Sequence, residues 1–487
     1  MSRHTLRFLW DAFARHPDDA PAVMTPDGRL TAGDIRRHAT AVARQLEQGG
    51  IPEGSVVALA VPNGLEFLPA LLALALRSCV VALTSPRLGL QGFTDILKHV
   101  APVALLSTLD FATVGRPGSA IDSRQIGEHT VSRPIQLRRL SDGRPATTLP
   151  PDTAAIKFSS GSTGIAKGIC LTASNLEIET ETVVHGLGVT GATRLIAPVP
   201  LFHSYGFDLG VLASLATGAP LYVTDGFVPR RALERLIETT PAVFLGVPVM
   251  YRLLLEGHPQ RLPSHRLVSC TAPLDAATIS RFAQAFGVPV CQHYGASEAG
   301  AVTLHEPEDA LAHPDAVGRP MRNVTVRITG PDGREVPAGE PGEVVVASGA
   351  VAAGYVMGAP RRSPFSGGAY AMGDVGVMDA SGLLTIQGRL DDLINVGGFK
   401  VAPAEVSRAL DTHPAVRESA VTGHRDGRGE MTVYAMVAAR APVTEAELIR
   451  HCQERLAEYK VPRRIDVLAE LPRGPSGKVR LDRERTA

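Results

Sequence analysis

The chain carries the stretch SSGSTGIAKG at residues 159–168, directly after an apolar run at 154–158 that predicts a buried strand. Three glycines allow the backbone to turn tightly and to approach a ligand closely. The hydroxyl groups, the lysine and the backbone N–H groups of the stretch suit phosphate oxygens. It is not a Walker A loop, because Ala166 precedes the lysine and Gly168 follows it. The stretch predicts a phosphate-binding loop, although alone it also fits a flexible surface turn.

Helices and strands alternate around this loop. Apolar periodicity predicts helices at 30–48 and 66–76, and short apolar runs predict strands at 55–61, 79–83, 103–107 and 194–199. This alternation is typical of parallel sheets with helices on both faces, and therefore of an α/β fold.

The pattern changes in the last third of the chain. From about residue 317, short strands separated by turns at 331–333 and 380–382 predict a β-rich subdomain. Helices at 402–411 and 444–456, with strands near 419–422 and 432–437, predict a separate α+β unit. We therefore expect an N-terminal domain at 1–389, with a β-rich subdomain at about 317–388, and a small C-terminal domain at 390–487.

Composition narrows the class of partner. The 487 residues are 44% hydrophobic and 20% charged, as in a globular protein with a large core. Basic and acidic residues both number 49, so the balance of charge favours neither nucleic acid nor an anionic membrane as a partner. The five cysteines lie far apart, which favours free thiols over zinc ligands or disulfides. Because the N-terminus lacks the pattern of a signal peptide, we expect a cytoplasmic protein with no membrane span.

Five further motifs follow the loop in a defined order. They are PLFHSYG at 200–206, YGASE at 294–298, YAMGD at 370–374, GRLDDLI at 388–394 with GGFKV at 397–401, and PRGPSGK at 472–478. Together with the loop, this order resembles that of the adenylate-forming superfamily, which contains acyl-CoA synthetases, adenylation domains of nonribosomal peptide synthetases, and luciferases. Two positions depart from its motifs, since Ala166 replaces a proline and Met372 replaces a threonine. The chain is identified as a member of this superfamily.

The resemblance implies an activity. The enzyme would use ATP to convert a carboxylic acid into its acyl-AMP with release of pyrophosphate, and would pass the acyl group to the thiol of CoA or of a carrier protein's phosphopantetheine. Because the carboxylate and the phosphates are all anions, this chemistry needs cations and hydrogen-bond donors where negative charge concentrates. Ser162, Thr163 and Lys167 would hold the β- and γ-phosphates. Lys478 would reach the substrate carboxylate and the α-phosphate, and Glu298 would bind Mg²⁺.

The resemblance also implies a nucleotide site. Tyr294 would pack near the adenine, and Asp374, assisted by Arg389, would accept the ribose hydroxyls. The residues assigned to the nucleotide are Ser159, Ser160, Gly161, Ser162, Thr163, Gly164, Lys167, Thr271, Ala272, Pro273, Tyr294, Gly295, Ser297, Asp374 and Arg389. Those assigned to catalysis are Lys478, Thr163 and His203. Without their motifs, Glu298 would be an ordinary solvated acid, Tyr294 a core residue and Lys478 a solvated residue near the chain end.

The motif at 200–206 implies where the acyl group binds. The expected lining residues are His203, Tyr205, Asp208, Val247, Gly295 and Ala296. His203 could gate the pocket or contact the carboxylate, while a lone histidine also fits a core position. Tyr205 falls where relatives that activate α-amino acids place an aspartate, which argues against a standard α-amino acid. Asp208 has two interpretations: it pairs with a substrate ammonium, as in a β-amino acid, or it is the N-cap of a helix at 209–215.

The remaining motifs concern the second half-reaction. In the superfamily the C-terminal domain is mobile and rotates between the two half-reactions. Asp391 would be the hinge, and Gly397 and Gly398 would lie beside the pantetheine tunnel, although the two glycines also fit a simple hairpin turn. We therefore expect an acyl-CoA synthetase or an acyl-carrier-protein ligase. The alternatives are a stand-alone enzyme that loads a β-amino acid or another amino acid onto a carrier protein, a luciferase-like oxygenase, and an inactive nucleotide-binding homologue.

Overall fold

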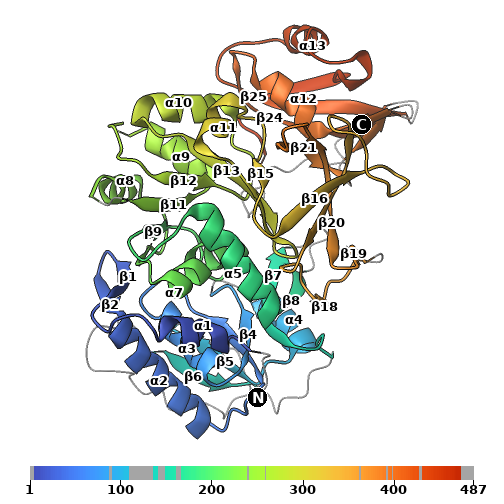
Figure 1. Cartoon of the computed structure of the whole chain (residues 1–487). Coiled ribbons are helices and arrows are strands. Elements are labelled where there is room, and N and C mark those ends of the chain that lie inside the picture. Colours follow the sequence, from blue (N-terminus) through green and yellow to red (C-terminus); the bar gives the residue numbers. More distant parts are fainter. Residues whose placement is uncertain are drawn as a thin grey trace. The chain divides into compact units, whose positions relative to one another are not determined.

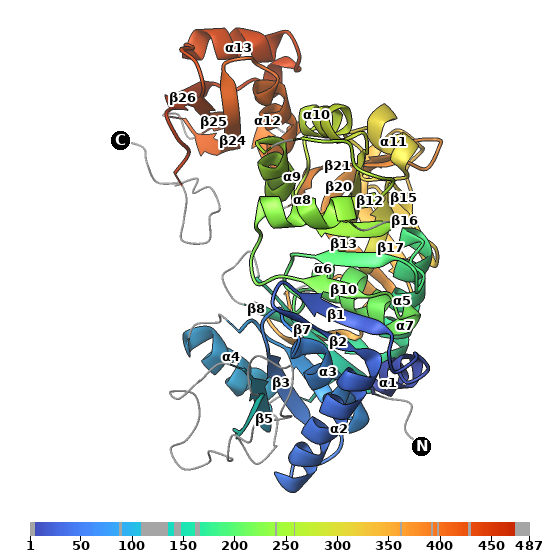
Figure 2. The ribbon, with the colours of Figure 1, turned by 90° about the vertical axis from the view of Figure 1, so that its left-hand side faces the viewer.

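The computed structural model describes residues 5–86, 90–108, 135–140, 148–160, 166–238, 241–257, 259–360, 363–390, 393–396, 399–426 and 430–472. The chain forms two compact units, whose elements are labelled in Figures 1 and 2. Unit 1 extends through Val326 and includes Val345–Tyr370 and Gly382–Leu384. Unit 2 comprises Arg327–Val344, Ala371–Ser381 and the chain from Thr385 onward.

One sheet of unit 1 has the strand order β15-β14-β13-β12-β11-β9-β10-β1-β2. Neighbouring strands are parallel along the part of the sheet with the order β13-β12-β11-β9-β10-β1. The strands β2, β14 and β15 are antiparallel to their neighbours. The bounds are β1 Pro21–Thr25, β2 Gly28–Thr31, β9 Arg194–Ala197, β10 Leu221–Val223, β11 Ala242–Gly246, β12 Arg266–Ser269, β13 Val290–Ala296, β14 Gly300–Leu304 and β15 Arg319–Pro320.

A second sheet of unit 1 has the order β18-β8-β7-β4-β3-β5-β6. Strands β5, β3, β4 and β7 are parallel, and β6, β8 and β18 pair antiparallel at the two ends. The bounds are β3 Val56–Ala60, β4 Val80–Leu83, β5 Ala104–Ser107, β6 Gln136–Arg139, β7 Thr153–Ser160, β8 Ala166–Thr172 and β18 Gly354–Met357.

Helices cover these two sheets, as Figure 1 shows. Helix α3 is buried along almost its whole length, which explains why apolar residues occupy every side of it. The helices are α1 Arg7–Phe13, α2 Ala32–Gln48, α3 Phe67–Leu76, α4 Leu90–Val100, α5 Ala173–Leu187, α8 Pro229–Glu238, α9 Pro248–Leu255, α10 Ala276–Phe286 and α11 Pro307–Ala312. A continuous helical segment is formed by α6 Ser204–Gly206, η1 Phe207–Leu212 and α7 Ala213–Thr217.

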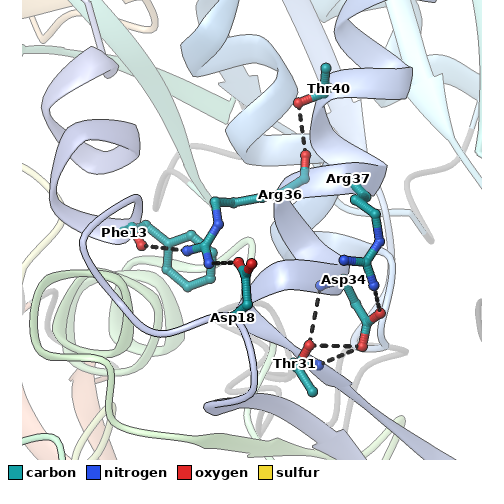
Figure 3. Close-up of polar contacts among 7 residues, drawn as sticks. All are labelled: Phe13, Asp18, Thr31, Asp34, Arg36, Arg37 and Thr40. Carbon is teal, nitrogen blue, oxygen red and sulfur yellow. Dashed lines mark hydrogen bonds and ion pairs between the residues drawn. The ribbon is translucent and has the colours of Figure 1, made fainter.

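Polar contacts fix the start of α2 (Figure 3). The Thr31 hydroxyl accepts from the backbone N–H of Asp34, and the Asp34 carboxylate accepts from the backbone N–H of Thr31, which together form a capping box. Arg36 donates to the backbone carbonyl of Phe13 at 3.2 Å and pairs with Asp18. Side chains of α2 therefore hold it against the end of α1 and the loop that follows.

Four strands of one sheet lie partly in unit 2, which contains half of β16 Val324–Thr329 and of β17 Pro341–Ser348 and most of β20 Ala369–Met378 and of β21 Leu384–Arg389. Further along the chain, β22 Ile394–Val396 pairs with β23 Phe399–Val401. A third sheet of β24 Val416–Arg425, β25 Met431–Ala439 and β26 Arg464–Leu468 packs with α12 Pro403–Asp411 and α13 Glu445–Gln453 around its own apolar core.

The predicted elements are found where the sequence placed them. The helices expected at 30–48, 66–76, 402–411 and 444–456 are α2, α3, α12 and α13, with ends shifted by a few residues at most. The α/β class with parallel sheets is confirmed. The domain boundary at 389/390 stays a prediction. All five cysteines lie in the described ranges as free thiols. Within the same ranges, no helix combines the length and the apolar character needed to cross a bilayer.

Candidate functional site

The predicted phosphate loop connects two antiparallel strands. Ser159 pairs with Lys167 and Ser160 with Ala166 at the end of the β7–β8 hairpin. The hairpin therefore places Ser159 directly opposite the lysine of the motif. The residues between the strands, Gly161, Ser162, Thr163 and Gly164, lie outside the described residues, and their phosphate contacts stay a prediction.

Lys167 lies beside the predicted metal ligand Glu298. Its Nζ is 3.8 Å from Glu298 Oε1 and 5.7 Å from the centre of the Tyr355 ring. Tyr355 donates its hydroxyl hydrogen to the same carboxylate oxygen at 2.9 Å. Glu298 is buried, with 7% of its surface exposed, so the lysine and the tyrosine offset much of the cost of its charge. Loop 159–168 and the motif at 294–298 therefore meet in space, as the resemblance requires.

This arrangement fits a magnesium ion held mainly by phosphates. Mg²⁺ takes oxygen ligands and is commonly bound by one or two carboxylates together with substrate phosphates. Glu298 supplies one buried carboxylate close to the phosphate hairpin. Among the described residues, no cluster of three or more histidine, cysteine or acidic side chains could hold a metal without such a substrate.

Tyr355 was not predicted as a site residue. It lies on β18, which joins the sheet beside β8 with Tyr355 opposite Ile169. Its hydroxyl is also 3.2 Å from that of Tyr370, and burial, followed by these hydrogen bonds and the Glu298 charge, raises its pKa well above the ordinary value. The sequence gives no local signal for this role, because the contact depends on the order of strands in the sheet.

The motif at 294–298 begins in β13 and ends in the turn to β14. Gly295 packs so closely that a Cβ atom there would lie 2.4 Å from the carbonyl oxygen of Gly300, so only glycine fits. Ser204 donates to the Ser297 hydroxyl at 2.7 Å. This hydrogen bond joins the predicted nucleotide motif to the predicted acyl segment, and it brings Gly295 and Ala296 near that segment as well.

The segment at 271–273, expected beside the adenine, is an exposed bend after β12. Thr271 has a φ of 76°, in the left-handed region that β-branched residues rarely adopt. Such a conformation costs about 1–3 kcal/mol and is commonly retained at functional sites. Thr271, Ala272 and Pro273 are thus presented to solvent by a strained backbone, and their contact with a nucleotide stays a prediction.

His203 is the N-cap residue of the helical segment that begins at Ser204. One side of its ring is open to solvent, while enough protein surrounds the rest that loss of hydration lowers its pKa. The Asp208 charge acts to raise this pKa, and the Lys157 charge acts to lower it. His203 is therefore close enough to both charges to be influenced by them.

Tyr205 uses its hydroxyl within the protein. The hydroxyl donates to the carbonyl of Val268 at 2.9 Å, and the ring stacks against His293 with centroids 6.2 Å apart. Only 5% of the residue is exposed, and burial raises its pKa well above the ordinary value. Its position in the acyl pocket stays a prediction, with the ring rather than the hydroxyl available to a substrate. Val247, expected as another wall, is the N-cap residue of α9.

The N-cap interpretation of Asp208 is wrong. The helical segment begins at Ser204, so Asp208 lies inside it, and the helix is not confined to 209–215. Lys157 Nζ donates to both carboxylate oxygens of Asp208, at 2.5 and 2.7 Å. Only 2% of the Lys157 side chain and 4% of the Asp208 side chain are exposed. Asp208 is therefore one half of a buried ion pair, and its partner comes from β7.

Glu179 is another buried carboxylate near this pair. Both of its oxygens accept from the backbone N–H of Ala301, at 2.9 and 3.1 Å. Burial, followed by the Asp208 charge, raises the pKa of Glu179 to about 8, while Lys157 and the Ala301 N–H oppose this. Because Ala301 follows the turn that bears Glu298, Glu179 fixes the position of that turn from α5.

Unit 2 carries the predicted ribose site. Arg389 donates to Asp374 Oδ1 at 2.9 Å, and Asp374 is 6% exposed. Gly373, just before Asp374, has a φ of 67°, which explains a glycine at this position. Met372 is buried where the motif usually has threonine. The structure thus brings Asp374 and Arg389 together, while Asp391, Gly397, Gly398 and Lys478 lie outside the described residues.

Comparison with known proteins identifies the family. The model of the AMP-binding enzyme family matches residues 9–356, and the model of the AMP-binding enzyme C-terminal domain matches residues 405–478. The chain therefore belongs to the AMP-binding enzyme family, as its motifs indicated. It is a ligase that forms acyl adenylates in an ATP-dependent reaction.

Individual relatives match over nearly the whole chain. The 3-[(3aS,4S,7aS)-7a-methyl-1,5-dioxo-octahydro-1H-inden-4-yl]propanoyl:CoA ligase of Mycobacterium tuberculosis is 30% identical and covers 96% of each chain. The sulfoacetate–CoA ligase of Cupriavidus necator is also 30% identical and covers 98% of this chain and 96% of its own. The solved structure of o-succinylbenzoate CoA synthetase from Bacillus subtilis, in complex with its acyl-adenylate intermediate, has a TM-score of 0.81 and 25% identity, over 99% of this chain and 98% of its own.

Proposed function

We propose that the chain is an acyl-CoA ligase that activates a small carboxylic acid through its acyl-AMP. The observation that carries this proposal is the contact of Lys167 and Tyr355 with the buried Glu298 carboxylate at the end of the phosphate hairpin. The cluster supports the proposal because it joins a cation to a carboxylate that could bind Mg²⁺, beside the hairpin predicted to bind phosphate. Both curated relatives are named as CoA ligases, which supports CoA as the acyl acceptor.

The first half-reaction joins two anions. A carboxylate oxygen of the substrate bonds to the α-phosphorus of ATP, the bond from that phosphorus to the bridging oxygen breaks, and pyrophosphate leaves with Mg²⁺. Lys167 and the hydroxyls of the loop would bind the departing phosphates, and Glu298 would hold the metal ion, which neutralises phosphate charge. Lys478 would lie between the substrate carboxylate and the α-phosphate, where its charge reduces their repulsion.

The second half-reaction replaces AMP with a thiol. The sulfur of CoA, after losing its proton, bonds to the acyl carbon, and AMP leaves as the bond to its phosphate oxygen breaks. The phosphopantetheine arm of a carrier protein is the alternative acceptor, and it offers the same thiol. Five free cysteines suit a reducing compartment, and we propose that the enzyme acts in the cytoplasm.

The proposal is tested by ATP–pyrophosphate exchange over aliphatic, aryl and dicarboxylic acids and over α- and β-amino acids. We expect exchange that depends on one class of acid and on Mg²⁺. The best acid is then incubated with CoA or with a phosphopantetheinylated carrier protein, and the thioester product is measured. Thioester formed with CoA supports the proposal, formation only on the carrier protein would replace CoA as the acceptor, and no exchange with any acid would refute the activity.

The role of Lys478 gives a second test. Lys478→Ala should slow exchange by at least about 100-fold, which corresponds to roughly 3 kcal/mol, because a preorganised cation beside the reacting phosphate is lost. Lys98→Ala, which removes an exposed lysine from the last turn of α4, is the matched control. Exchange by Lys478→Ala at the rate of this control would remove Lys478 from the catalytic residues.

A further inference from the structure

The buried ion pair of Lys157 and Asp208 lies beneath the acyl segment. Asp208 lies in the same helical segment as Tyr205, five residues after His203. Lys157 belongs to β7, two residues before Ser159 at the phosphate hairpin. Tyr205 and Asp208 are three residues apart in this helical segment, so the pair lies close to the predicted acyl segment.

The geometry of the pair is that of an amine bound by a carboxylate. The Lys157 ammonium donates to both Asp208 oxygens, at 2.5 and 2.7 Å, and lies 5.6 Å from the centre of the Phe207 ring. The ammonium group at the end of the Lys157 side chain thus reaches the Asp208 carboxylate from β7. A substrate ammonium at the same place would make the same two hydrogen bonds and would also remove the cost of burying the Asp208 charge.

A purely structural role would not require charge. Well-packed apolar residues commonly replace a buried ion pair with little loss of stability or with a gain. The neighbours of Asp208 in the helical segment, Phe207 and Leu209, are buried apolar residues, so apolar side chains fit these surroundings. A charge in this place, three residues after Tyr205, therefore points to a role in which acids the predicted acyl site accepts.

We propose that Lys157 is a specificity-determining residue that occupies the amine position of the acyl site. Its ammonium group pairs with the Asp208 carboxylate from within the protein, so this carboxylate is not available to a substrate ammonium. The positive charge of Lys157 would also repel the positive charge of a substrate ammonium. The acids activated by this chain therefore lack an amino group near the carboxylate. This assignment rests on the proposed function, and it replaces both interpretations of Asp208 from the sequence, as the partner of a substrate ammonium and as a helix N-cap.

The experiment compares the best acid of the exchange screen with its 3-amino derivative. For each, kcat/KM is measured by ATP–pyrophosphate exchange in the full-length wild type, in Lys157→Gln and in Lys157→Met with Asp208→Leu. Lys157→Gln keeps hydrogen-bond donors for the carboxylate and removes the charge, so Asp208 can receive a substrate ammonium. The double variant removes both charges and serves as the matched control.

We expect the wild type to prefer the acid without the amine by at least about 100-fold, as sites that leave a buried polar group unpaired typically do. Lys157→Gln should lower this ratio at least about tenfold, mainly through a lower KM for the amine. The double variant should return to the wild-type ratio, because the Asp208 carboxylate is gone and the nearby Glu179 carboxylate accepts from the Ala301 N–H. NMR chemical shifts or circular dichroism show whether each variant is folded. If Lys157→Gln does not fold, Lys157→Met takes its place.

Two outcomes would overturn the assignment. The first is equal ratios in the single variant and in the double variant, which would leave the pair with a structural role only. The second is a higher kcat/KM of the wild type for the 3-amino derivative than for the acid without the amine, a comparison that requires no variant. Exchange with no acid at all is a different result, because it would refute the proposed function rather than the role of Lys157.

Discussion

Tyr355 determines how the Glu298 carboxylate is presented to a metal ion. Its hydroxyl holds Oε1, while Lys167 lies 3.8 Å from the same oxygen, so the orientation of the carboxylate is set from β18 and β8 together. Groups that orient a metal ligand in this way typically change metal affinity 10–100-fold when they are removed. Tyr355 is therefore a positioning residue for the metal site.

Tyr355→Phe should raise the Mg²⁺ concentration at half-maximal exchange by about tenfold, with a much smaller effect on the maximal rate. The ring that packs against Phe365 remains, while the hydrogen bonds of the hydroxyl with Glu298 and with Tyr370 are lost. Exchange measured over a range of Mg²⁺ concentrations gives both quantities. Tyr434→Phe removes a tyrosine hydroxyl from a different carboxylate, Asp466, and should leave the Mg²⁺ dependence as it is. A lower maximal rate with unchanged Mg²⁺ dependence would contradict this role.

Among single residues, those that lie within a contiguous motif could be assigned to the site from the sequence. Lys167, Glu298, Asp374 and Arg389 are found beside the partners that their roles require. Tyr355 was missed because no motif contains it, and it reaches the site only through the order of strands in the sheet. Lys157 left a signal that could have been used: a lysine within an apolar strand needs a buried partner, and Asp208 within an apolar helix needs one too.

Among the elements, the β13–β14 hairpin has the clearest dependence on pH. His293 lies in β13 opposite Leu304, His305 directly follows β14, and burial lowers the pKa of each to about 4. In the unfolded chain their pKa is near 6.5, so between about pH 6.5 and 4 the unfolded state binds more protons than the folded state. Their contribution to stability is complete above pH 6.5 and is lost as the pH falls toward 4.

His305→Gln should therefore reduce the loss of stability on acidification. Each histidine accounts for about 3 kcal/mol between pH 7 and 4, since one pKa unit corresponds to about 1.4 kcal/mol. Glu179 acts in the opposite direction, because its raised pKa lowers stability as the pH rises from about 4.5 to 8, and so the variant must be compared with wild type at each pH. Urea midpoints at pH 7 and 5 give the comparison, with His185→Gln on α5 as the control. An identical change of midpoint in wild type and His305→Gln would show that His305 does not titrate with unfolding.

Elements were easier to predict than the site because each has a local cause. Thr31 begins α2 and Thr444 begins α13 through capping boxes, and both threonines precede helical apolar periodicity in the sequence. The helix containing Asp208 was placed too late, because its first turn begins after His203 without a capping side chain and then widens into the π-helical turn at Phe207–Leu212. A π-helical turn leaves no pattern in a single sequence that distinguishes it from an α-helix.

At the scale of the whole molecule, the chain forms two units, and the residues predicted to bind the nucleotide are divided between them. The phosphate hairpin and Glu298 belong to unit 1, whereas Asp374 and Arg389 belong to unit 2. Each half was predictable from its motifs, because a motif specifies its own local geometry. The arrangement of the units was not predictable in this way, and the rotation that the resemblance implies between the two half-reactions stays a prediction.

The predicted hinge at Asp391 makes that rotation testable. Proline fixes its own φ and restricts the residue before it, so Asp391→Pro should hold the C-terminal domain in one orientation. If that orientation is the one that forms acyl-AMP, pyrophosphate exchange stays within a few-fold of wild type while CoA thioester formation falls at least about tenfold, because closure of a domain commonly completes a catalytic site. Asp391→Ala removes the carboxylate without restricting the backbone and should support both half-reactions. Both rates are measured with the best acid of the screen. An equal loss of exchange and thioester formation in Asp391→Pro would mean that residue 391 supports the fold of the enzyme rather than its rotation.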